Sequence, residues 1–100
     1  MQSSKDNDFY NRADAHIMLA NEQMTKAGQI PTNMSFMYSV ARFNAWVVAS
    51  GFKTSDEMQH AKAGALDYFL NEYKQMLDEH LDDYIRNFDA YAESTEEPQE

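Results

Sequence analysis

The sequence predicts an all-α protein, and three observations support this fold class. Apolar residues recur at the three- and four-residue spacings of an amphipathic helix over most of the chain. Of the two prolines and three glycines, all but Gly64 lie between or after the periodic segments, where helices begin and end. The chain has 100 residues and 43% of them are hydrophobic, which suffices for one small domain without disulfides. We therefore expect a small helical bundle of three to four helices.

The first predicted helix covers residues 8–27. An acidic or amide side chain at positions 6–8 can cap its start, and Gly28 stands where helices commonly end. Three of the six residues in its apolar stripe are alanine, so a neighbouring helix can approach closely. The stripe consists of Tyr10, Ala13, Ile17, Ala20, Met24 and Ala27.

The second predicted helix covers residues 33–50, after Pro31 and before Gly51. Its apolar residues occupy most of the circumference, and Arg42 is its single charged residue. A helix that is apolar nearly all round is normally central in its protein. We therefore expect this helix to contact neighbours on several sides, with Arg42 at the edge of the core and paired to an acidic residue.

The last periodic segment covers residues 55–92. Thr54 and Glu57, three residues apart, form the pattern of a capping box at its start. As one helix the segment would be about 57 Å long, whereas a compact domain of this size has a radius of gyration of only about 13 Å. Two alternatives follow: a break in the polar stretch 78–83, giving helices 55–79 and 82–92, or one continuous helix whose far half packs in a homodimer. We favour the break, and a homodimer in either case.

The acidity of the chain is concentrated near its end. The net charge is −9, yet residues 1–52 hold four acidic and four basic residues, whereas residues 78–100 hold nine acidic residues and one basic. We expect an acidic C-terminal helix, a disordered acidic tail over residues 93–100, a disordered N-terminus over residues 1–7 and a single helical domain over residues 8–92. This charge argues against binding of nucleic acid and favours a basic protein partner.

The sequence lacks the features of a secreted, membrane-spanning or enzymatic protein. It has no cysteine, no apolar run of about 20 residues and no secretory signal at its start, so we expect a cytoplasmic protein. Glu57 and His60 share a helix face, but neither His16 nor His80 repeats the spacing as a di-iron site requires. We expect no metal, no cofactor, no catalytic residue and no enzymatic activity.

Two groups of residues are candidate contact sites. One lies on the second helix, where Arg42 has an aromatic residue four positions to each side, Tyr38 and Trp46. These three would suit a small molecule or an anion if they line a pocket. The other is an apolar stripe on the acidic last helix, which would suit a second copy or a basic, grooved partner. That stripe consists of Leu81, Tyr84, Phe88 and Tyr91.

Several long stretches carry a family resemblance. They are RADAHI (12–17), LANEQ (19–23), YSVARFNAW (38–46), LDDYI (81–85) and NFD (87–89). Together they resemble a family of small bacterial proteins, domain of unknown function family 3144, over about residues 8–92. The resemblance implies a single-domain helical protein with no assigned activity and offers no catalytic motif.

The function that we expect from the sequence is non-enzymatic. It is a helical protein that acts by protein–protein contact, as a homodimer. The alternative is a protein that binds a small molecule or an anion in a pocket near Tyr38, Arg42 and Trp46.

Overall fold

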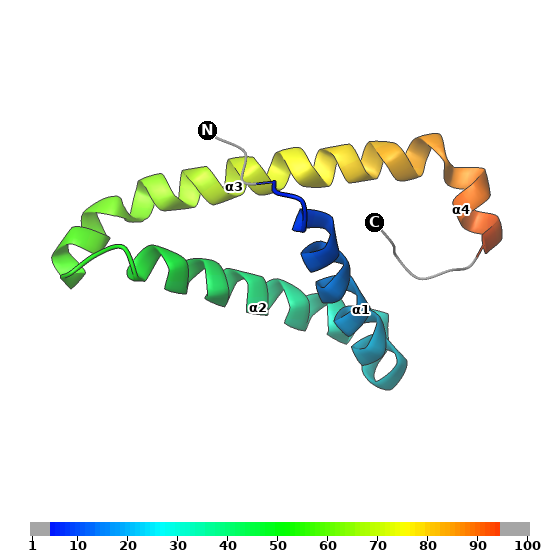
Figure 1. Cartoon of the computed structure of the whole chain (residues 1–100), viewed down its shortest axis with the longest axis horizontal. Coiled ribbons are helices and arrows are strands. Elements are labelled where there is room, and N and C mark those ends of the chain that lie inside the picture. Colours follow the sequence, from blue (N-terminus) through cyan, green and yellow to red (C-terminus); the bar gives the residue numbers. More distant parts are fainter. Residues whose placement is uncertain (1–4, 95–100) are drawn as a thin grey trace. The chain divides into compact units, whose positions relative to one another are not determined.

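The computed structural model describes residues 5–94, and it confirms the predicted all-α class for them. Helices α1 (Phe9–Ala27), α2 (Gln29–Ala49), α3 (Ser55–Arg86) and α4 (Phe88–Ser94) account for nearly all of that range (Figure 1). Most of the two terminal segments that we expected to be disordered lies outside the described residues, at positions 1–4 and 95–100.

The chain divides into two units, and the boundary falls inside α2 between Ala41 and Arg42. The first unit contains α1 and the beginning of α2. The second contains the rest of α2 with α3 and α4. A single domain over residues 8–92 stays a prediction.

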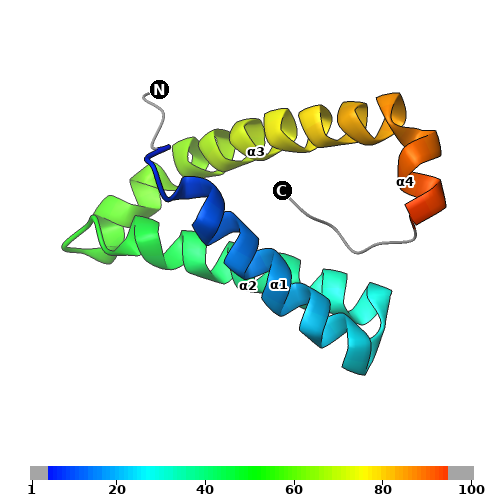
Figure 2. The same ribbon diagram turned by 45° about the vertical axis from the view of Figure 1, so that its right-hand side comes forward.

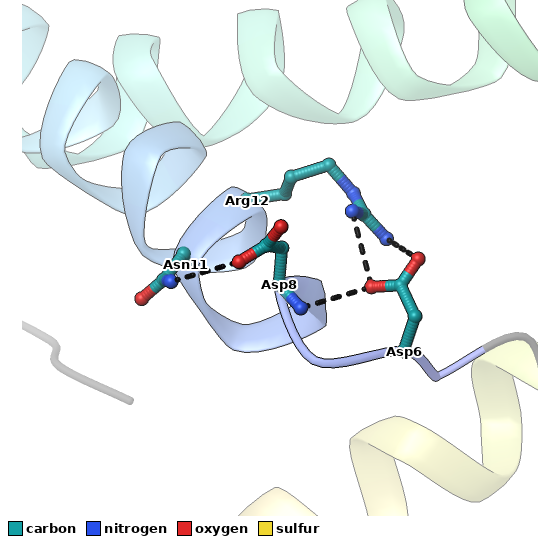
Figure 3. A network of polar contacts seen from close by, with 4 residues as sticks. All are labelled: Asp6, Asp8, Asn11 and Arg12. Atoms are coloured by element: carbon teal, nitrogen blue, oxygen red, sulfur yellow. Dashed lines mark hydrogen bonds and ion pairs between the residues drawn. The ribbon is translucent and has the colours of Figure 1, made fainter.

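The start of α1 is held by a network of charged and amide side chains around Asp6 (Figure 3). The Arg12 guanidinium lies 3.2 Å from the Asp6 carboxylate, and the Asp8 backbone N–H donates to the same carboxylate at 3.0 Å. The Arg12 hydrogen bond, followed by that from Asp8, lowers the pKa of Asp6 below its usual 3.8. Asn11 donates to the Asp8 carboxylate at 3.5 Å, so side chains of the first turn continue the network.

One residue, Gly28, joins α1 to α2. Its N–H donates to the Met24 carbonyl at 2.9 Å, which ends α1 at the glycine that the sequence indicated. Its own carbonyl accepts from the Thr32 N–H at 3.3 Å and so begins the next helix. Its dihedral angles, φ 90° and ψ 171°, lie in a region that is essentially restricted to glycine.

Helix α2 begins at Gln29, four residues before the predicted start at residue 33. We expected Pro31 to precede the helix, but it lies within the first turn. Backbone N–H groups in that turn have no partner inside the helix, so a proline costs no hydrogen bond there. The proline therefore marks the first turn of α2 rather than the loop before it.

The start of α3 has the Thr54 half of the predicted capping box, whereas the Glu57 carboxylate reaches one residue further back than the pattern requires. The Glu57 N–H donates to the Thr54 hydroxyl oxygen at 3.2 Å, and the Glu57 carboxylate accepts from the Lys53 N–H at 3.1 Å. These bonds satisfy a backbone donor of the first helical turn and one in the preceding loop.

Helix α3 runs through the polar stretch 78–83 and breaks at Asn87, so the predicted helices 55–79 and 82–92 are wrong in their boundaries. Figure 2 shows α3 as one long helix with α4 turned away from its end. The Asn87 side-chain amide donates to both the carbonyl and the carboxylate of Asp83, each at 3.0 Å. Such local side-chain bonds compete with the helical pattern, whereas a run of solvated acids on a helix does not.

Apolar side chains are poorly covered throughout the described residues, and none of them is buried. Four of the predicted stripe residues of α1 are half-buried, namely Ala13, Ile17, Ala20 and Met24, whereas Tyr10 remains 54% exposed. Thr32 is the one buried polar residue in residues 5–92, and its hydroxyl has no hydrogen-bond partner there. The expectation that α2 is enclosed on several sides is therefore wrong for the chain by itself.

Candidate functional site

The first candidate group lies on α2 and forms no enclosed site. Tyr38 is 73% exposed and Trp46 is 63% exposed. Arg42 is exposed as well, and within residues 5–94 its side chain has no ion pair or hydrogen bond. The expected pairing of Arg42 with an acidic residue is therefore wrong, because α2 offers no core edge at which a buried charge would need a partner.

A hollow elsewhere on the chain does not coincide with this group. It is a shallow depression along α1, between Met18 and Lys26, and is open to solvent. Ligand sites of small molecules are normally concave and bury most of the ligand surface. The exposed geometry of Tyr38, Arg42 and Trp46 therefore gives no support to a pocket at these residues.

Sequence reasoning missed the aromatic partner of Trp46. The ring centroid of Phe43 lies 5.9 Å from that of Trp46, and Phe43 is 62% exposed. The two residues are three positions apart, a spacing that places side chains on one helix face. The three-residue interval in the sequence is therefore the signal that indicates this ring pair.

The second candidate group forms a cluster where α3 meets α4. The rings of Tyr84 and Tyr91 are 4.9 Å apart at 74°, an edge-to-face contact, and the rings of Phe88 and Tyr91 are 6.0 Å apart. Three residues of the predicted stripe, Tyr84, Phe88 and Tyr91, therefore lie close together across the break at Asn87. We call Leu81, Tyr84, Ile85, Phe88 and Tyr91 the aromatic corner.

The aromatic corner is exposed and lies in an acidic segment. Its five side chains are between 38% and 70% exposed, and Ile85, which the predicted stripe omitted, is the most exposed of them. Residues 78–92 hold five acidic residues and one basic residue, Arg86. The Arg86 guanidinium lies 3.8 Å from the Asp83 carboxylate, so the single cation of the segment already faces an acid.

The histidines do not gather metal ligands in the structure. The His60 Nδ1 lies 2.8 Å from the Asp56 carbonyl oxygen, and the Glu57 carboxylate is engaged in the α3 cap. In residues 5–94 no three histidine or acidic side chains lie close enough together to hold a metal ion.

None of the helices in residues 5–94 is both long and apolar enough to cross a bilayer.

Comparison with known proteins identifies relatives by sequence and by structure. The sequence model of a family described as Protein of unknown function (DUF3144) matches residues 9–85. Among solved structures, the NMR structure of the protein NB7890A from Shewanella sp is similar, with a TM-score of 0.73 and 40% sequence identity. The similarity covers 94% of this chain and 100% of that one. The comparison with curated proteins gave no match.

Proposed function

Because the chain belongs to the DUF3144 family, which carries no assigned activity, we propose a function from its own surface: it is a non-enzymatic, cytoplasmic helical protein that acts by protein–protein contact, as a homodimer. One observation carries the proposal. The described residues expose many large apolar side chains and bury none, although this composition could supply a core. Exposed apolar area of this extent is typical of an interaction surface.

Helix α2 is the best surface for a second copy. Eight of its large apolar side chains are between 44% and 76% exposed. Aromatic side chains bury about 150–250 Å² each, so the exposed parts of Tyr38, Phe43 and Trp46 amount to about 400 Å². A standard interface takes about 800 Å² from each partner. These side chains are spread round the circumference of α2, so one partner cannot cover all of them. Phe43 and Trp46, which share a helix face, supply about 250 Å² of the area, and their apolar neighbours on that face must supply the rest.

The charge of α2 also favours pairing with itself. Arg42 is the single charged residue among its 21 residues. Homodimer interfaces are usually two-fold symmetric, so residues close to the axis face their own copies, where like charges repel. A helix with one exposed cation avoids this repulsion when that cation stays at the solvated rim of the interface.

Sedimentation analysis of the full chain at tens of micromolar tests the homodimer. The expected mass is twice the 11.6 kDa of one chain. A strict monomer over this concentration range would contradict the proposal.

A charge placed in α2 tests the surface. Phe43→Glu puts a carboxylate beside Trp46 and should convert the dimer to monomer, because an unpaired charge is costly to bury. Gln59→Glu is the matched control, since it adds the same charge at an exposed position of α3. Circular dichroism checks that both variants remain helical. If Phe43→Glu stays dimeric, α2 is not the contact surface.

A further inference from the structure

We propose that the aromatic corner binds a basic, amphipathic helical segment of a different protein. The inference rests on the proposed function, because it names one partner class for a protein that acts by contact. The corner lies within one unit of the chain, so its geometry is set by α3, Asn87 and α4 alone.

The aromatic side chains provide the contact surface. Tyr84 and Phe88 both lie near the Tyr91 ring, and they are 38% and 58% exposed. Aromatic residues that form such clusters are frequent among those that dominate binding energy. Their ring faces also attract Lys and Arg side chains.

The acidic residues around the corner decide which partner can cover it. Residues 78–92 carry a net charge of −4, from five acidic residues and one basic. Two copies of the corner facing each other would bring two segments of net charge −4 together, and like charges across an interface disfavour association. A second copy is therefore the wrong occupant here, in contrast to α2. A segment rich in Lys and Arg has the complementary charge and associates faster with an acidic surface.

The partner segment must also be apolar on one face. Charge alone would leave Phe88 and Ile85 in contact with water, whereas an amphipathic helix covers them with its own apolar stripe. The recognised chemistry is thus a helix with apolar residues at three- and four-residue spacing and basic residues on both sides of that stripe.

NMR titration of the full-length, ¹⁵N-labelled protein tests the proposal. The probe is a synthetic 18-residue peptide of Leu and Lys at helical spacing. One control peptide replaces each Lys by Glu, and another replaces each Leu by Gln. We expect the Leu–Lys peptide to shift the amide signals of residues 78–92, and both controls to bind at least tenfold more weakly. Shifts centred elsewhere, or equal binding of the Gln–Lys peptide, would overturn the proposal.

Two variants separate the aromatic and electrostatic contributions. Tyr84→Ala combined with Phe88→Ala should weaken peptide binding at least tenfold. Asp89→Asn should weaken it severalfold and reduce its dependence on salt, whereas Asp67→Asn, the same change on an earlier part of α3, should not. Equal effects of the two Asp variants would show that binding follows total charge and would contradict the proposal. None of these substitutions lies on α2, so sedimentation reports failure of the homodimer separately from failure of peptide binding.

Discussion

Two glycine-to-alanine substitutions should have opposite effects on stability, although both sites offer the same free space. A Cβ atom built on Gly28 or on Gly64 meets nothing within 4 Å. Gly64 lies inside α3, where alanine is favoured over glycine by about 1 kcal/mol. Gly28 has φ 90° and ψ 171°, where a residue with a Cβ costs about 1–3 kcal/mol. The backbone conformation, and not the free space, determines whether alanine raises or lowers the stability at each site.

Thermal unfolding followed by circular dichroism measures both changes. For a chain of this size about 1 kcal/mol corresponds to about 4–8 °C, so Gly64→Ala should raise Tm by that amount. Gly28→Ala should lower Tm by at least as much. All samples must have one protein concentration, because the Tm of a dimer depends on concentration.

A fall in Tm for Gly64→Ala would refute the reasoning. Since no atom of the chain itself lies near that Cβ position, a loss of stability would mean that another chain packs there. The homodimer surface would then include α3 near Gly64.

Three further perturbations test local features of the helices. Thr54→Ala should lower the free energy of unfolding by about 1 kcal/mol in urea titration, because the cap to Glu57 is lost; an unchanged value would show that the cap is not stabilising. Arg12→Gln should raise the NMR-measured pKa of Asp6 towards 3.8. Since the pKa of Asp6 is lowered in the folded chain, the ion pair stabilises above pH 3.8 and the effect is lost as the pH falls through the lowered pKa; the variant should show a weaker pH dependence, because the Asp8 N–H still donates to Asp6. Asn87→Ala should extend α3 into α4, seen as helical chemical shifts at position 87; persistence of the break would assign it to another cause.

Local signals in the sequence predicted most helix ends. Gly28 ends α1 and Thr54 with Glu57 begins α3, as expected, because each signal acts within one turn of the backbone. The break at Asn87 was missed because asparagine is tolerated in helices and its amide only competes when a carbonyl lies within reach. The start of α2 was predicted too late for a related reason. Proline is compatible with the first turn of a helix as well as with the loop before it, and the sequence does not distinguish the two positions.

The candidate sites were less predictable than the helices. The stripe through Tyr84, Phe88 and Tyr91 follows from helical spacing, and the structure brings these rings together across the break. A pocket at Tyr38 and Trp46 needs a second element to close over them, and sequence spacing on one helix contains no information about such an element. The expectation that Arg42 lies at the edge of a core and pairs with an acidic residue was wrong for the same reason.

Because Gly28 alone joins α1 to α2, a small change in its backbone angles moves the far end of α1 by a large distance. With 19 residues, α1 is about 28 Å long. A rotation of about 10° at the joint therefore displaces the far end of α1 by about 5 Å, using the same rise per residue. Two dihedral angles of one residue thus set the direction in which α1 leaves α2. A change in the backbone angles of Gly28 would therefore move the half-buried stripe from Ala13 to Met24 as one body.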